Sequence, residues 1–264
     1  MSGMAEALSP GWTTHLGVLE HAGATVTPGD GCVVVRCEPL PDFHWGNFLL
    51  VTDGDVDDAD RWAAEFSAAF PAASWVAIGL TRLPSRVDAW ERIGLEVEQD
   101  DVLTTNVLPR QAALPDGYTV RALTGPDWAQ QVARDVAGNA ADGTYEPAGY
   151  QRFAESQGRW RQEMAARGVA CFFGAFAGAD LVSDLGIIRC GRLARYHNVA
   201  THPAHRRRGL AAHLLGVAGT WAGDRGCDEW VIVTESTNDA GRVYRRAGFG
   251  PDRLMAQAYR PPAR

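Results

Sequence analysis

The residues with the most evident chemical potential are Arg206, Arg207 and Arg208, which are followed by Gly209 and an apolar run. A β-rich segment ends at Thr201 just before them, so the pattern predicts a strand, a glycine-bearing turn and then a helix. The N-terminus of a helix leaves N–H groups unpaired and carries partial positive charge, which suits a pyrophosphate. Gly209 lets the backbone approach an anion closely. An anion-binding turn is therefore expected here, although a solvated basic helix start would have the same composition.

Three sequence motifs resemble the GNAT superfamily of N-acetyltransferases. The two best-known phosphate-binding patterns, GxxxxGK[ST] and GxGxxG, do not occur in the sequence. Instead, Arg206, Gly209 and Ala211 match the family's pyrophosphate motif [QR]xxGx[GA]. The lead-in NVATHP (198–203) is similar to its strand-to-turn segment, and VYRRAGF (243–249) is similar to its [LV]YxxxGF signature. The motifs follow one another in the family's order and spacing.

The resemblance implies an acetyl-CoA-dependent N-acetyltransferase in which an amine attacks the thioester directly in a ternary complex. In the family, backbone groups of the strand before the turn pair with the pantetheine arm, and N–H groups of the turn hold the pyrophosphate. By position, the implied cofactor-binding residues are Val199, Ala200, Thr201, Arg206, Arg207, Arg208, Gly209, Leu210, Ala211 and Ala212. Many members carry an asparagine seven residues before the tyrosine of the signature. Here Thr237 takes that position and Asn238 follows it, so either residue is a candidate for that contact.

Acetyl transfer to an amine requires a proton donor for the departing thiolate and a base for the ammonium group. Tyr244 matches the tyrosine of the family signature and is the candidate acid, because a phenol with a pKa near 10 stays protonated at neutral pH. His197 lies nine residues before Arg206, at the offset of a histidine in serotonin-type members, and is the candidate base. Glu235 is the rival base. A packed tyrosine and a packed or exposed histidine are the structural alternatives.

The remaining histidines near the turn, His202, His205 and His213, are expected to be solvent-exposed and not chemical groups. No carboxylate or cysteine completes a familiar ligand spacing with them, so no metal is predicted. The five cysteines lie in no paired metal spacing and are expected to be reduced thiols.

Strand-like and helix-like segments alternate along the chain, which predicts an α/β (α+β type) fold. The resemblance implies a GNAT fold, a mixed and mostly antiparallel sheet flanked by helices. The proline-rich stretch 108–117 indicates a boundary between a domain of residues 1–112 and a catalytic domain of residues 113–264. The segment DAWERIGL (88–95) is similar to GRVYRRAGF (241–249), with Trp90 at the place of Tyr244. The fold is therefore predicted to be duplicated, a tandem GNAT protein whose N-terminal half is degenerate.

The composition limits the partners. A formal net charge of −7 argues against nucleic-acid binding. Without a membrane-spanning run or a recognisable leader sequence, a cytoplasmic location is expected. A small-molecule or peptide amine is the expected partner, and a homodimer is left open.

Two other interpretations stay open. The chain could be a non-catalytic acyl-CoA-binding or sensing protein. The aromatic segment 41–48 could form a separate ligand or dimer surface, or a core crossing. A loop over residues 142–150 is expected to lie over the active site, with Asp142 and Glu146 attracting a cationic amine.

Overall fold

The computed structural model describes residues 8–143, 145–236 and 240–262 of the chain. The chain divides into two compact units. Unit 1 comprises Met1–Val102, Val233–Thr237 and Asp252–Arg264, and unit 2 comprises Leu103–Ile232 and Asn238–Pro251. Each unit therefore contains a segment from the other half of the chain.

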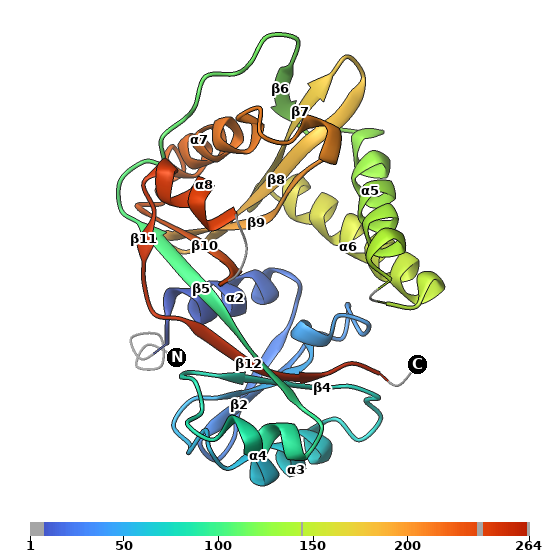
Figure 1. The fold of residues 1–264 in the computed structure, drawn as a ribbon, viewed down its shortest axis with the longest axis vertical. Helices are drawn as coiled ribbons and strands as arrows, with labels where there is room; N and C mark the ends of the chain where they lie inside the picture. The colour runs from blue at the N-terminus through green and yellow to red at the C-terminus, as the bar shows by residue number, and fades with distance from the viewer. Residues whose placement is uncertain (1–7, 144, 237–239, 263–264) are drawn as a thin grey trace. The chain divides into compact units, whose positions relative to one another are not determined.

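Unit 1 is a mixed sheet with helices on it (Figure 1). Its strands have the order β1-β2-β3-β4-β12-β5, and all neighbours are antiparallel except β3 and β4. The elements are α2 (Pro10–His21), β1 (Thr25–Pro28), β2 (Cys32–Arg36), the 3-10 turn η1 (His44–Gly46), β3 (Phe48–Val51), α3 (Ala59–Ala69), β4 (Val76–Leu80), α4 (Val87–Arg92), β5 (Glu96–Thr105) and β12 (Met255–Arg260). The last strand of the chain, β12, thus lies inside the sheet of the first unit.

Unit 2 has the strand order β10-β9-β8-β7-β6, and only β9 and β10 are parallel. Helices α5 and α6 contact β8 and β7 respectively, while α7 packs across β7, β8 and β9 (Figure 1). The elements are β6 (Thr119–Ala122), α5 (Asp127–Asp142), α6 (Pro147–Ala166), β7 (Ala170–Ala177), β8 (Asp180–Cys190), β9 (Leu193–Thr201), η2 (Pro203–His205), α7 (Leu210–Gly223), β10 (Glu229–Glu235), α8 (Ala240–Ala247) and β11 (Gly250–Pro251). The predicted mixed, mostly antiparallel sheet flanked by helices is confirmed.

The two units repeat one order of elements. A three-stranded meander is followed by a crossover helix, a parallel strand and a short helix, as β1-β2-β3-α3-β4-α4 in unit 1 and β7-β8-β9-α7-β10-α8 in unit 2. Both short helices end with a left-handed glycine, Gly94 at φ +76° and Gly248 at φ +110°. In both, the next N–H reaches back five residues, from Leu95 to Trp90 O (3.0 Å) and from Phe249 to Tyr244 O (3.2 Å). The similarity between the two short segments therefore extends to their hydrogen bonds.

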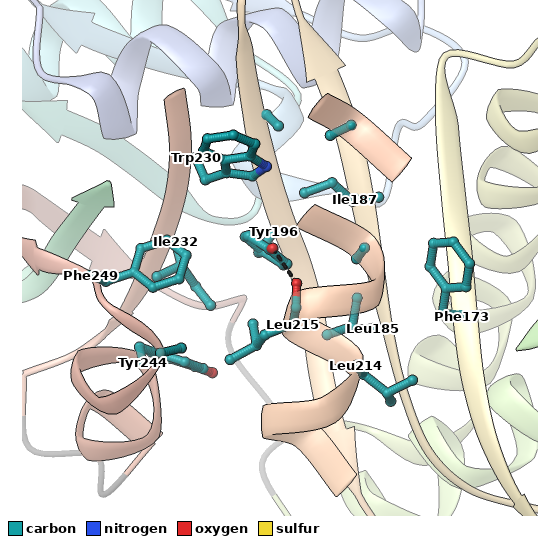
Figure 2. Packing of buried hydrophobic residues seen from close by; sticks show 14 of the residues in the cluster. Phe173, Leu185, Ile187, Tyr196, Leu214, Leu215, Trp230, Ile232, Tyr244 and Phe249 are labelled. Carbon is teal, nitrogen blue, oxygen red and sulfur yellow. Dashed lines mark hydrogen bonds between the residues drawn. The ribbon is translucent and has the colours of Figure 1, made fainter. Parts of the chain in front are cut away.

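The core of unit 2 lies between α7, α8 and one face of the sheet (Figure 2). Leu185 and Ile187 of β8 and Tyr196 of β9 point to this face, since side chains alternate along a strand. Tyr196 donates a hydrogen bond from its hydroxyl to Leu215 O of α7 at 2.5 Å (Figure 2). This contact fixes α7, and with it the turn that precedes α7, on β9.

The segment expected to be a linker packs on α7 and α8. A Cβ atom at Gly216 would lie 2.2 Å from Gln111 Cβ, so α7 has a glycine where this segment crosses it. Arg110 donates its N–H to Ala247 O at the end of α8 (2.8 Å). His213, which was expected to be exposed, is buried and its Nδ1 lies 2.7 Å from Ala112 O. The expectation for His213 was wrong because α7 is covered here by the chain that leads into unit 2.

Other local expectations also change. The sequence did not predict α2, which is capped by Ser9 and buries Trp12, whose indole donates to Leu80 O (3.1 Å). The predicted loop 142–150 is shorter, because α5 ends at Asp142 and α6 begins at Pro147, capped by the Glu146 side chain.

In the aromatic segment 41–48, Phe48 is fully buried and His44 stacks on Trp75 at 4.3 Å. His44 Nδ1 also lies 2.7 Å from the hydroxyl of Tyr259 in β12. These contacts favour a packed core crossing over a separate ligand surface.

Candidate functional site

Strand β9 contains an irregularity in its pairing with β8. His197 is opposite Gly186 and Ala200 is opposite Asp184, so two residues of β9 face one of β8. This β-bulge includes Asn198, which has a positive φ of 52°. On the other side, the register with β10 runs only from Leu193 to Arg195. The backbone from the bulge to Thr201 therefore lies beyond the registered pairing with β10, as a strand that receives an extended ligand would require.

The predicted cofactor-contacting strand residues, Val199, Ala200 and Thr201, lie on this stretch and are half-buried. Ser183 of β8 fixes them, because its hydroxyl donates to Ala200 O (2.9 Å) and lies 2.8 Å from Thr201 Oγ1. The end of the strand is thus held from the β8 side.

The turn from residue 202 to residue 209 folds as predicted, as a tight connection into a helix. The Nδ1 atom of His202 accepts a hydrogen bond from Ala204 N (3.3 Å) and caps η2. Arg206 Nε donates back to Thr201 O (3.2 Å). Arg207 has a positive φ of 62°, which is uncommon for a residue with a side chain. The arginine side chains of the turn are exposed, so their charge is available to a ligand.

Gly209 is the N-cap of α7, with φ +85° and no side-chain cap hydrogen bond. A Cβ here would have nothing within 4 Å, so the requirement for glycine comes from the left-handed backbone and not from packing. The first hydrogen bond of the helix runs from His213 N to Gly209 O (2.9 Å). The N–H groups of Leu210, Ala211 and Ala212 precede it, and a helix leaves such groups without internal partners. The turn therefore offers N–H donors and a helix dipole to an anion, and three exposed arginines stand directly before them in the chain.

A tyrosine from the start of unit 2 lies against this turn. Arg208 donates from Nη1 to the Tyr118 hydroxyl (3.0 Å) and from Nη2 to Ala204 O (3.3 Å). The same hydroxyl lies 2.8 Å from His205 Nδ1. Tyr118 was not predicted from the sequence, because it stands about 90 residues before the arginine it contacts.

Tyr244 lies in α8 at the edge of the core cluster and is 5% exposed (Figure 2). Burial raises the pKa of Tyr244 to about 12. Among the described residues no hydrogen bond to its hydroxyl occurs, in contrast to Tyr196, whose hydroxyl is bound to Leu215 O. Burial also raises the pKa of Tyr196 above its ordinary value. Of these two tyrosines, Tyr244 is the one whose hydroxyl has no acceptor within the described chain.

The candidate bases have different surroundings. His197 is half-buried on β9, and its ring meets Trp160 of α6 edge-on at a centroid distance of 6.1 Å. Glu235 is exposed at the end of β10 and belongs to the 233–237 segment of unit 1. Thr237 and Asn238 lie outside the described residues. The base assignments and the contacts of residues 237 and 238 remain predictions.

A buried polar network lies between α5, α6 and β8. Asp184 is fully buried and forms an ion pair with Arg134. Arg161 donates from Nη1 to Gln131 Oε1 (3.1 Å) and to Asp135 Oδ2 (3.0 Å). Two arginines and two aspartates thus balance each other in charge. A buried ion pair needs such partners to offset the cost of removing both charges from water.

Three side-chain N–H groups on α6 are buried without a hydrogen-bond partner among the described residues. They belong to Gln157 (Nε2), Trp160 (Nε1) and Arg161 (Nε). Their spacing of three and four residues places them on one side of the helix. Trp160 is also the residue against the His197 ring. Every one of these groups can only donate a hydrogen bond.

The corresponding turn of unit 1, between β3 and α3, has the opposite character. Its sequence TDGDVDD (52–58) carries four aspartates and no arginine. Asp58 caps α3 by accepting from Arg61 N (3.3 Å), and Trp62 donates from its indole to Asp55 O (2.7 Å). A Cβ at Gly54 would lie 2.1 Å from the Trp62 ring. The negative charge of this turn and its self-capped helix start do not suit a phosphate.

A family model matches part of the chain. Residues 141–249 match the model of the acetyltransferase (GNAT) family. The matched residues include all three motifs that resemble this family. The search of curated proteins found no sequence that matches the chain.

Solved structures show the same fold over most of the chain. A GCN5-related N-acetyltransferase from Kribbella flavida has a TM-score of 0.65 and 15% identity, with 95% of each chain covered. A functionally unknown conserved protein from Staphylococcus epidermidis has a TM-score of 0.70 and 10% identity, covering 91% of this chain and 95% of that chain. A tandem GNAT protein from the clavulanic acid biosynthesis pathway has a TM-score of 0.54 and 13% identity, covering 100% and 96%. At these identities the likeness shows the fold alone.

No helix among the described residues is long and apolar enough to cross a membrane. Within the same residues, no group of three or more His, Cys, Asp or Glu side chains could hold a metal ion.

Proposed function

We propose that this protein is an acetyl-CoA-dependent N-acetyltransferase that transfers the acetyl group to a primary amine by direct attack in a ternary complex. The observation that carries the proposal is the continuous path of bulged strand, arginine turn and left-handed Gly209 at the start of α7. This path fits two parts of acetyl-CoA, the extended pantetheine arm and the anionic pyrophosphate. The strand end from Val199 to Thr201 would pair with the pantetheine arm, and the N–H groups from Arg207 to Ala212 would hold the pyrophosphate.

In the reaction, the amine nitrogen forms a bond to the thioester carbonyl carbon and the carbon–sulfur bond breaks. One amine proton leaves to a base, for which His197 and Glu235 are the candidates, and the coenzyme A sulfur leaves as a thiolate that takes up a proton from the solvent. Tyr244 would direct its hydroxyl hydrogen at the departing sulfur. Because its pKa of about 12 lies above that of a thiol, the phenol keeps its proton and stabilises the developing thiolate by hydrogen bonding.

The acceptor amine is proposed to bind on the α6 side of β9, next to His197. The contact of Trp160 with His197 supports this placement. The unpartnered donors of Gln157, Trp160 and Arg161 on α6 would suit hydrogen-bond acceptor atoms elsewhere in the same amine molecule, because a buried donor without a partner is costly.

Unit 1 is proposed to be a second GNAT-like copy that has lost its cofactor site, which makes the chain a tandem protein with domains close to residues 1–112 and 113–264. The repeated order of elements and the acidic, self-capped turn support this. Trp90 stands where Tyr244 stands in unit 2, is fully buried, and donates its indole N–H to Val56 O (3.1 Å). It offers no hydroxyl. A cytoplasmic location and a homodimer remain predictions from the sequence.

The test is release of free thiol from acetyl-CoA in the presence of a broad panel of primary amines, with the product identified by mass. Transfer to at least one amine, abolished by Gly209→Asp, supports the enzyme. Tight acetyl-CoA binding without transfer to any amine would favour the alternative, a non-catalytic acyl-CoA-binding or sensing protein.

A further inference from the structure

The contact between Tyr118 and Arg208 has no role in the pyrophosphate site described above. An arginine can only donate hydrogen bonds, so the Tyr118 oxygen accepts from Arg208 Nη1 at 3.0 Å. This leaves the hydroxyl hydrogen of Tyr118 for His205 Nδ1, 2.8 Å away. The three side chains form one chain of donors and acceptors, in which each bond polarises the next. The Tyr118 ring also meets the His205 ring edge-on, at 5.7 Å and 83°.

These contacts hold the Arg208 guanidinium to one side of the turn. Its second anchor is Ala204 O in η2 (3.3 Å), so the group is fixed between η2 and the start of β6. An exposed arginine side chain ordinarily samples many rotamers and loses this conformational entropy when it binds a ligand. Anchoring the side chain beforehand lowers that entropy cost of binding. Arg208 uses two of its five N–H donors in this arrangement, and the others remain for a ligand.

Arg206 is also anchored, but on a different part of the chain. Arg206 is bound through Nε to Thr201 O, back toward the strand. Arg207 has no hydrogen bond from its side chain among the described residues. Arg208 is therefore the arginine whose guanidinium is anchored on η2 and on Tyr118, the residue before β6.

We propose that Tyr118 and His205 position Arg208 to bind the phosphomonoester on the ribose of the cofactor, so that the turn distinguishes coenzyme A from its 3′-dephosphorylated form. This inference rests on the proposed function for the identity of the cofactor. Coenzyme A carries a pyrophosphate and one further phosphate. With the pyrophosphate on the helix N–H groups, the remaining phosphate is the proposed partner of the Arg208 guanidinium, which is anchored on Tyr118 and Ala204 O. Arginine suits it because its planar donors can bind a phosphate in a bidentate manner.

The test is isothermal titration of the full chain with coenzyme A and, separately, with 3′-dephospho-coenzyme A. The quantity of interest is the ratio of the two dissociation constants. In the parent protein, coenzyme A is expected to bind about tenfold or more tightly than the dephosphorylated form, the range of one charge-assisted contact. Arg208→Gln should bring the ratio close to one. Tyr118→Phe should lower it about threefold or more, because Arg208 must then be ordered on binding.

Two matched variants isolate the effect. Arg207→Gln removes the same charge one residue away and should weaken both ligands by the same factor, leaving the ratio unchanged. Ser67→Ala removes an exposed hydroxyl from α3 in unit 1 and should leave both constants unchanged. Thermal unfolding of each variant verifies that it is folded.

Equal affinity of the parent for both ligands would overturn the inference while leaving the cofactor site intact. An unchanged ratio in folded Tyr118→Phe would overturn the positioning role. If the parent bound neither ligand, the proposed function would fail as well.

Discussion

Replacing Tyr244 by Phe removes one oxygen atom from α8 and tests how the departing thiolate is stabilised. Burial raises the pKa of Tyr244 to about 12, while a thiol has a pKa of about 8.5. Complete proton transfer from this phenol to a free thiolate would therefore be uphill by about 3.5 pKa units, or about 5 kcal/mol. The hydroxyl is expected to act as a hydrogen-bond donor to developing charge, and its loss should lower kcat by about 10²-fold.

The assay is steady-state thiol release at saturating acetyl-CoA, measured from pH 6 to pH 10 for the parent and the variant. Because the phenol is protonated throughout this range, the shape of the pH profile should not change when it is removed. The dissociation constant of acetyl-CoA should stay within about twofold. The free energy of unfolding should change by less than about 1 kcal/mol, since the ring remains in the core and no described acceptor is left unpaired.

An unchanged kcat would refute the role of the hydroxyl. A basic limb in the parent that disappears in Tyr244→Phe would refute the raised pKa, because the tyrosine would then be titrating within the assayed range.

Three further predictions concern the surrounding structure. Asp184→Asn should lower the free energy of unfolding by about 3–5 kcal/mol, because Arg134 and Arg161 must then share Asp135 as their counter-charge in the buried network; the exposed-pair variant Arg92→Gln is the control, with an effect below about 1 kcal/mol. Trp90→Phe should lower stability by about 1–3 kcal/mol through its lost indole hydrogen bond, yet leave kcat unchanged, and a large loss of kcat would show that unit 1 takes part in the chemistry. The folded-state pKa of Asp127 is lowered to about 2 by its hydrogen bonds with the Arg121 side chain, which outweigh the effect of burial. Ionised Asp127 therefore contributes about 2 kcal/mol to the free energy of unfolding above the unfolded-state pKa of about 3.8, and this contribution is lost as the pH falls toward 2. Denaturant titrations should show this loss in the parent protein and not in Asp127→Asn.

The site could be predicted from the sequence where its signal is local. Gly209 and Gly248 occupy left-handed positions that few other residues adopt, and each stands within a short motif that fixes a turn. Helices and strands could be distinguished by their hydrophobic periodicity, which is also a local signal. The start of α5 is also built locally, because Asp127 turns its carboxylate back to accept from Thr124 N (2.8 Å).

The features that were missed depend on distant parts of the chain. The position of β12 between β4 and β5 cannot be read from its own residues, because any strand of suitable pattern could fill that place. The burial of His213 depends on the crossing segment near Ala112. The contact of Tyr118 with Arg208 joins residues about 90 positions apart, and neither residue type indicates the other.

The central claim, that the arginine turn binds acetyl-CoA, is tested most directly by isothermal titration of acetyl-CoA into the parent, Gly209→Asn and Gly209→Asp. Asparagine and aspartate have the same size, and both tolerate the φ of +85° better than other side chains. The variants therefore differ in charge alone. A negative charge about 5 Å from the pyrophosphate, at an effective dielectric constant of about 20, costs about 3 kcal/mol, or about 10²-fold in affinity. The account predicts micromolar binding by the parent, weaker binding by the Asn variant and a further loss of about that size in the Asp variant. Equal affinity of the Asp and Asn variants, or no binding by the parent, would contradict it.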